Sequence, residues 1–272
     1  MQKVFNLTNK YIVLATPLIL YALISSIYLA VSASSGKIIN LILAILLYTL
    51  MAGAFIAGWF NMIKIAILEP EREEVNSLLK EFPSGVGEYF LPALGAIFVI
   101  FIEFELIFAA SYFIGMNTIG DPKISTDALS KAMQSTTALK AFVLSLNPEQ
   151  LTKINLWNML VLGAMTIGYF LFILYLPAIF FKNKNPFIAF FVSLKDLFSK
   201  KFFKTLGIYL LIFIVNFIIS AFSTIFGANT MIHFIMTLIN FYFVTFVGVG
   251  IFYYYYNNFV QDKIGQNVDV EI

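Results

Sequence analysis

Long apolar runs separated by short charged connections dominate the pattern of hydrophobic and polar positions along the chain. A helix needs about 20 mostly apolar residues to cross the hydrocarbon core of a bilayer. Six windows meet that requirement, and they are residues 11–31, 38–60, 89–115, 156–181, 206–226 and 231–256. The apolar run of the second window continues to Leu68. The pattern therefore predicts an all-α, polytopic membrane helix bundle with about six transmembrane helices.

The composition supports this prediction and excludes several classes of protein. Hydrophobic residues make up 60% of the chain and charged residues only 12%, whereas soluble domains contain roughly 45–50% and about 25%. Neither a soluble enzyme nor a nucleic-acid-binding protein is expected. Cysteine is absent, and His233 and Arg72 are the single residues of their types. We therefore expect no enzyme, no catalytic residue, no cofactor and no metal site.

Lysine and arginine residues set the expected orientation, because these residues are enriched in cytoplasmic loops. With the N-terminus in the cytoplasm, the inner segments hold 12 of them and the outer segments hold 5. We expect a multi-pass protein of the cell (plasma) membrane with both termini in the cytoplasm. Val31-Ser32-Ala33 is typical of a signal-peptide cleavage site. However, the 21-residue apolar window before it exceeds the roughly 7–15 residues of the apolar region of a signal peptide, so the window is kept as a span.

Two of the inner segments have the periodicity of amphipathic helices. In residues 70–82 the apolar residues recur at the spacing of one helical stripe, and Pro83-Ser84-Gly85 is expected to end that helix. In residues 186–204 phenylalanines fall on one face, and Asp196 and the lysines fall on the other, which is typical of a helix in the headgroup plane. The predicted lipid- or partner-binding residues are Lys195, Lys200, Lys201 and Lys204. Attraction to anionic lipids contributes about 1 kcal/mol of binding free energy for each lysine.

The two amphipathic segments also resemble each other. With a shift of 116 residues, Pro70 aligns with Pro186 and Ser77 with Ser193. Each segment follows a span that enters the cytoplasm and precedes a span that leaves it. This order predicts an internal duplication with repeat units 38–115 and 156–226.

Residues 116–155, between the two repeat units, are too long for a bare loop. We expect an extracytoplasmic helical segment with short helices over 127–133 and 138–146. Asn147-Pro148-Glu149-Gln150 is typical of a helix start, because Asn caps, Pro takes the first helical position and Gln reaches back. The whole chain, residues 1–272, is predicted to form a single integral membrane domain.

One stretch resembles a known group of proteins. It reads Asn185-Pro186-Phe187-Ile188-Ala189-Phe190-Phe191-Val192-Ser193-Leu194-Lys195 and runs through a lysine cluster into the next span. It is similar to a motif in uncharacterised prokaryotic six-span integral membrane protein families, which are related to the membrane domain of some glycerophosphodiester phosphodiesterases. The resemblance covers residues 181–217 and implies a fold and a location. No phosphodiesterase catalytic domain is present, so no catalytic residue is carried over.

Glu103 and Glu105 lie near the middle of the third window. A carboxylate at that depth costs about 2–3 kcal/mol or more, so each must be protonated, hydrogen-bonded, hydrated or bound to a cation. The two side chains point about 200° apart on a helix, and small residues beside Glu103 favour its facing the bundle. With Asn216 and Asn240 at similar depth, they form the predicted solute- or ion-binding site. The alternative is that these polar groups only join helices.

Two functions remain open from the residues. The first is a non-enzymatic membrane protein that binds a small solute or lipid, or transports it, through the polar site near the bilayer midplane. The second is an accessory or scaffold protein whose amphipathic helices dock a partner or anionic lipid. The expected partners are the lipid bilayer, anionic inner-leaflet lipids and a protein partner or homodimer. Gly53 and Ala57 allow close helix packing, for which internal contact is favoured over a dimer.

Overall fold

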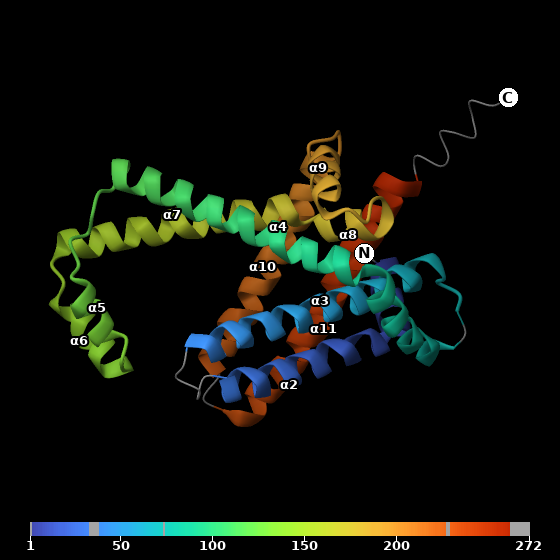
Figure 1. The fold of residues 1–272 in the computed structure, drawn as a ribbon, viewed down its shortest axis with the longest axis horizontal. Coiled ribbons are helices and arrows are strands. Elements are labelled where there is room, and N and C mark those ends of the chain that lie inside the picture. The colour runs from blue at the N-terminus through green and yellow to red at the C-terminus, as the bar shows by residue number, and fades with distance from the viewer. Residues whose placement is uncertain (1, 33–37, 73, 227–228, 262–272) are drawn as a thin grey trace. The chain divides into compact units, whose positions relative to one another are not determined.

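The computed structural model describes residues 2–32, 38–72, 74–226 and 229–261. These residues are all-α (Figure 1), and six of the helical segments are long and apolar enough to cross a membrane. The six spans are Ile12–Ser32, Ile39–Leu68, Ser77–Thr118, Pro148–Phe181, Phe202–Ile225 and Thr230–Val260. Each overlaps one predicted window, so the prediction of an all-α bundle with six spans is confirmed. Ala33 of the possible cleavage site and the C-terminal residues 262–272 lie outside the described residues.

The elements follow one another in a simple order. They are α1 (Gln2–Lys10), η1 (Ile12–Leu14), α2 (Ala15–Ser32), α3 (Ile38–Leu68), η2 (Val75–Lys80), α4 (Glu81–Thr118), α5 (Thr126–Ala132), α6 (Thr136–Ser145), α7 (Pro148–Phe172), α8 (Tyr175–Phe181), α9 (Pro186–Leu197), α10 (Phe202–Phe226), α11 (Thr230–Tyr255) and η3 (Tyr256–Val260). The elements η1 and η2 are 3₁₀-helices, and η3 is a π-helical turn.

The chain packs as two units. Unit 1 comprises the described residues up to Val99 and from Leu171 onward, and unit 2 comprises Ile100–Phe170. The long helix α4 contributes its first part to unit 1 and its second part to unit 2. This division concerns packing alone, so the single membrane domain and its two repeat units stay predictions.

Helix α3 lies at the centre of unit 1, where it contacts α2, α8, α11, η1 and η2. Its glycines allow α4 to approach closely. A Cβ added at Gly53 would lie 2.6 Å from Leu94 Cδ2, and one added at Gly58 would lie 2.6 Å from Phe82 Cδ2. The small residues of α3 therefore serve internal helix packing, as expected, and this face is not free to form a dimer.

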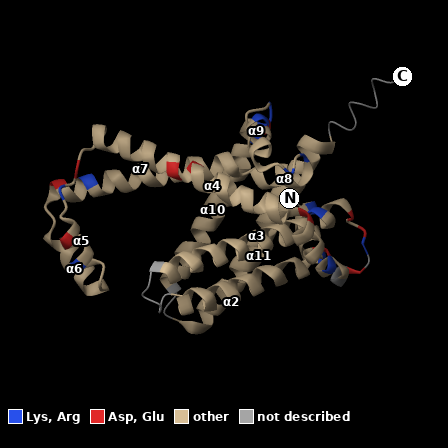
Figure 2. Cartoon of the chain, in the orientation of Figure 1, with Lys and Arg blue, Asp and Glu red and all other residues tan. Residues whose placement is uncertain are grey.

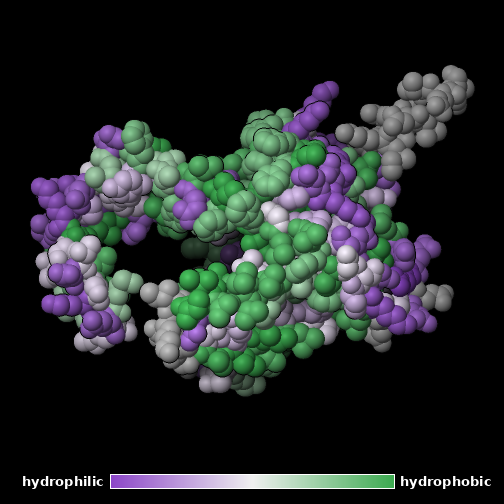
Figure 3. All heavy atoms as spheres, viewed as in Figure 1, coloured by the Kyte–Doolittle hydropathy of each residue, from purple (hydrophilic) through white to green (hydrophobic). Residues whose placement is uncertain are grey.

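Aromatic side chains fill the core of unit 1. Phe60 stacks on Phe252 with ring centroids 4.9 Å apart, and Tyr89 stacks on Phe180 at 4.3 Å. Such pairs are worth about 0.5–1.5 kcal/mol beyond the area they bury. Together they tie α3 and α4 to α8 and α11. Figure 3 shows hydrophobic residues over α2 and α3 on the face in view, as expected for helices that meet lipid.

The predicted helix over residues 70–82 is wrong. Pro70 lies in a turn, the 3₁₀-helix η2 covers Val75–Lys80, and α4 begins at Glu81. Pro83-Ser84-Gly85 does not end a helix but lies in the first turns of α4. Proline is tolerated there because the first N–H groups of a helix have no intrahelical partner. Gly85 is needed for close packing, because an added Cβ would lie 2.7 Å from the backbone oxygen of Ala57.

The second amphipathic segment is confirmed in its first part and wrong in its second. Asn185 caps α9, because its Oδ1 accepts hydrogen bonds from the backbone N–H groups of Phe187 at 3.0 Å and Ile188 at 3.2 Å. The helix ends at Leu197, so of the four predicted lysines it carries Lys195 alone. The other three lie in the turn before α10 and in its first turn. A short turn between α9 and α10 thus divides the segment that the periodicity predicts as one helix.

The N-terminal helix α1 has no counterpart in the predicted elements. It is amphipathic, with Val4 and Leu7 buried, and it packs against α11. A Cβ added at Gly250 of α11 would lie 3.6 Å from Val4 Cγ1. The hydroxyl of Tyr242 donates a hydrogen bond of 2.8 Å to Asn9 Oδ1. Nine residues of helix are too short for a span, which is why the window criterion misses them.

Unit 2 contains the second part of α4, the short helices α5 and α6, and α7. The two short helices confirm the elements expected over 127–133 and 138–146. The start of α7 is also confirmed, since Asn147 Oδ1 accepts from Gln150 N at 2.8 Å and Gln150 Oε1 accepts from Asn147 N at 3.2 Å. At the end of α4, Gly120 has φ +79°, a left-handed conformation that glycine adopts readily.

Candidate functional site

Glu103 lies on the face of α4 that packs against α7 within unit 2. A Cβ added at Gly168 of α7 would lie 3.7 Å from Glu103 Oε2. Both carboxylate oxygens are buried, and among the described residues neither has a hydrogen-bond partner. Glu105 is exposed. The structure thus brings Glu103, and not Glu105, against a neighbouring helix, which is the arrangement that the small residues on its face favour.

The two predicted asparagines belong to unit 1. Asn216 lies on α10 and Asn240 on α11, and both are exposed. Exposure means that neither amide is enclosed in a polar cavity. Since Glu103 and Glu105 belong to unit 2, the four-residue site at the bilayer midplane stays a prediction.

The C-terminal turn η3 brings two of the four predicted lysines together. Lys201 Nζ donates a hydrogen bond of 2.7 Å to the backbone oxygen of Asn258, and Lys204 Nζ donates one of 3.1 Å to Asn258 Oδ1. Lys195 and Lys200 are exposed. Figure 2 shows that charged residues of unit 1 gather at α9 and at the connection between α3 and α4. We call the lysines around α9 the lysine-rich end of unit 1, and they are Lys182, Lys184, Lys195, Lys200, Lys201 and Lys204.

A buried ionic cluster joins three elements at the lysine-rich end. Asp196 Oδ2 accepts hydrogen bonds from Lys182 Nζ at 2.5 Å and from the hydroxyl of Tyr255 at 2.6 Å. Asp196 is only 8% exposed. The pattern of residue types on α9 explains why: Ala189, Ser193 and Asp196 form a buried stripe at helical spacing. Sequence reasoning placed Asp196 on the polar face, although the small residues at that spacing signal a packed face.

A groove of about 620 Å³ runs between α10 and α11. Its lining residues are Val4, Lys204, Ile208, Leu211, Ile212, Val215, Phe243, Phe246, Val247, Gly250, Ile251, Tyr253, Tyr254, Asn257 and Asn258. The lysine and the two asparagines lie at one end, and the remaining lining is apolar apart from two tyrosine hydroxyls. From Lys204 to Val215 the helix rises about 16 Å, at about 1.5 Å per residue. That length matches one leaflet of a hydrocarbon core of about 30 Å.

The polar end of the groove carries a positive charge. Lys204 Nζ lies 5.4 Å from the ring centroid of Tyr254, a distance at which the ring attracts a cation. The hydroxyls of Tyr254 and Thr205 are hydrogen-bonded at 2.8 Å, so the ring is held in place. No carboxylate pairs with Lys204 among the residues that the structure describes. The arrangement can therefore hold an anionic group whose apolar tail lies along the groove.

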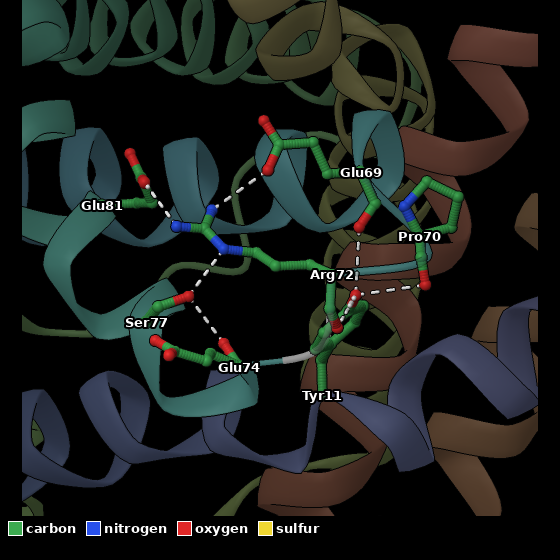
Figure 4. A network of polar contacts seen from close by, with 7 residues as sticks. All are labelled: Tyr11, Glu69, Pro70, Arg72, Glu74, Ser77 and Glu81. Atoms are coloured by element: carbon green, nitrogen blue, oxygen red, sulfur yellow. Dashed lines mark hydrogen bonds and ion pairs between the residues drawn. The ribbon is translucent and has the colours of Figure 1, made fainter.

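Arg72 belongs to a network of ion pairs and hydrogen bonds at the connection between α3 and α4 (Figure 4). Its guanidinium group forms ion pairs with Glu69 at 3.3 Å and Glu81 at 3.1 Å, and donates a hydrogen bond of 2.6 Å to Ser77 Oγ. The hydroxyl of Tyr11 donates a hydrogen bond of 3.0 Å to the backbone oxygen of Glu69. The network fastens the start of the first span to this connection, and its charge is compensated.

Two further lysines surround Tyr89. Lys64 Nζ donates a hydrogen bond of 2.7 Å to the Tyr89 hydroxyl, and Lys184 forms an ion pair of 2.8 Å with Glu88. Both ammonium groups lie 5.1 Å from the centroid of the Tyr89 ring. The cluster joins α3, α4 and the connection between α8 and α9. Its lysines therefore serve packing, in contrast to Lys204.

No group of three or more His, Asp or Glu side chains that would suit a metal ion occurs among the described residues. A search against protein families, curated proteins and solved structures found no match for this chain. The resemblance to six-span prokaryotic families thus rests on residues 181–217 and stays a prediction. The six apolar spans identify the chain as a multi-pass, all-α integral membrane protein.

Proposed function

We propose that the protein is a non-enzymatic membrane protein that binds an anionic phospholipid in the groove between α10 and α11. The observation that carries the proposal is the division of the groove into a charged end and an apolar length. A phospholipid has the same division. The ammonium group of Lys204 is a point charge suited to phosphate, and the amides of Asn257 and Asn258 supply further polar contacts.

The expected orientation supports the choice of ligand. Under the positive-inside rule, the lysine-rich end of unit 1 faces the cytoplasm. The cytoplasmic leaflet carries the anionic lipids, and a juxtamembrane lysine gains about 1 kcal/mol from them. An acyl chain in the groove would then reach from the headgroup region to the midplane, because the groove is about one leaflet long.

The test measures lipid binding to the purified protein by native mass spectrometry, with phosphatidylglycerol and phosphatidylcholine as probes. Lys204→Gln should weaken phosphatidylglycerol binding about fivefold, which corresponds to about 1 kcal/mol, and should leave phosphatidylcholine binding nearly unchanged. Lys200→Gln is the matched control, because it removes the same charge from an exposed position outside the groove. Equal losses in the two variants would reduce the effect to general surface charge and contradict the proposal.

A second variant tests the apolar part of the groove. Val247→Trp places a large side chain among the lining residues and should displace both lipids, whatever their charge. Leu210→Trp is its control, because Leu210 is 47% exposed and does not line the groove. Unchanged lipid binding in Val247→Trp would show that the acyl chain lies elsewhere.

A second candidate function rests on Glu103, whose buried oxygens have no partner among the described residues. A carboxyl group in that position suits binding of a proton or small cation during solute transport. Flux measured in proteoliposomes would then be lost in Glu103→Gln and kept in Glu105→Gln. If Glu103→Gln retains full flux, or if no flux is found for any tested solute, this candidate fails and the lipid proposal is unaffected.

A further inference from the structure

Polar residues continue the stripes that line the groove beyond its deep end. On α10, Asn216 lies four residues after Ile212, and Ser220 and Ser223 follow at helical spacing. On α11, Asn240 lies three residues before Phe243. Thr237, His233 and Thr230 then continue the α11 stripe at spacings of three, four and three residues. The face that is apolar in one half of the membrane is therefore polar in the other half.

These polar side chains lie on the outside of unit 1. Asn216, Asn240 and His233 are all exposed. The hydroxyl of Thr237 donates a hydrogen bond of 2.9 Å to the backbone oxygen of His233, so its donor is satisfied within the helix. No hydrogen bond of either asparagine side chain occurs among the described residues. Lipid tails offer no partner for an amide, and leaving one unpaired in hydrocarbon costs several kcal/mol.

We infer that this polar face of α10 and α11 docks a second copy of the chain. An amide is both donor and acceptor, so the same side chain on two copies can pair across a two-fold axis. Hydrogen bonds between such groups join helices in membranes. The partner must present hydrogen-bonding groups at the same depth, and a second copy does so with the same two asparagines.

Other faces of unit 1 are less suited to this contact. The glycine face of α3 is occupied by Leu94 and Phe82 of the same chain. The exposed face of α2, which carries Leu23 and Ile27, is apolar and is satisfied by lipid tails. The dimer inference rests on other residues than the lipid proposal, namely those beyond the deep end of the groove.

The absence of cysteine allows a direct test. In a chain with one introduced cysteine, a disulfide can join only two copies, and it requires Cα atoms about 4.4–6.8 Å apart. Single cysteines at polar positions spaced three or four residues apart should give oxidised dimers in native membranes. These positions are Asn216, Ser220, Ser223, His233, Thr237 and Asn240. Phe217→Cys and Leu23→Cys are controls on exposed apolar faces. Equal cross-linking at the controls and the polar positions would overturn the inference.

A second measurement tests the amides themselves. The double variant Asn216→Leu/Asn240→Leu should raise the dimer dissociation constant in bilayers about tenfold, as expected for the loss of two interhelical hydrogen-bonded pairs. The double variant to Gln, which keeps both amides, should retain most of the association. Single-molecule photobleaching of the wild-type protein in vesicles gives the reference. Monomers at all protein densities would overturn the inference, while phosphatidylglycerol binding would still report on the groove separately.

Discussion

Removal of the Asp196 carboxylate should destabilise the lysine-rich end of unit 1. The side chains of Lys182 and Asp196 are only 16% and 11% exposed, and Tyr255 donates a second hydrogen bond to the same oxygen. Breaking a buried pair by removing one partner typically costs about 3–5 kcal/mol. Both side chains keep some contact with solvent, so we expect the cost of Asp196→Leu to lie near the lower limit, at about 3 kcal/mol.

The reasoning is tested by a double-mutant cycle. Unfolding of the purified protein in mixed micelles, measured by steric trapping or by denaturant, gives the free energy for the wild type, Asp196→Leu, Lys182→Met and the double variant. Replacing both charges by apolar side chains should recover much of the loss, because buried ion pairs are often no more stable than apolar contacts. A loss below about 1 kcal/mol for Asp196→Leu, or additive losses in the double variant, would refute the reasoning.

Three other substitutions have expected outcomes in the same unfolding assay. Tyr11→Phe removes the hydrogen bond to the backbone oxygen of Glu69 and should cost about 1 kcal/mol, with faster proteolysis of the connection between α3 and α4. Gly53→Val places a Cβ 2.6 Å from Leu94 Cδ2 and should cost about 1–3 kcal/mol; Gly163→Val, where an added Cβ meets nothing within 4 Å, is its control. Asn185→Ala removes the cap of α9 and should cost about 0.5–2 kcal/mol, whereas Asn185→Asp should retain most of the stability.

The spans and the helix starts are predictable from the sequence because their causes are local. An apolar run of sufficient length predicts each span without knowledge of its neighbours. The caps at Asn185 and Asn147 depend on residues at most three positions away. The spans and the starts of α7 and α9 therefore lie where the sequence predicts them.

The errors occur where distant residues decide the local structure. Residues 70–82 have the periodicity of a helix, yet the hydroxyl of Tyr11, 58 residues before Glu69, donates hydrogen bonds to the backbone oxygens of Glu69 and Pro70, and Pro70 lies in a turn. Asp196 is buried because Lys182 of the α8–α9 connection and Tyr255 of α11 meet it. Neither partner is identified by the spacing of residues on α9. The groove likewise depends on the packing of α10 against α11, and the apolar window of one span does not predict which other span packs against it.

Phospholipid binding and dimerisation on the α10–α11 face should influence each other. The groove occupies one half of the α10–α11 face, and the exposed amides of Asn216 and Asn240 continue it in the other half. A lipid that fills the groove would add apolar surface beside the contact between two copies. If lipid strengthens dimerisation by some factor, dimerisation must strengthen lipid binding by the same factor, since binding free energies are reciprocal. The dimer dissociation constant should therefore fall as phosphatidylglycerol is added to wild-type vesicles and should respond less in Lys204→Gln. A dimer whose stability is equal in phosphatidylglycerol and phosphatidylcholine would show that the two sites are energetically separate.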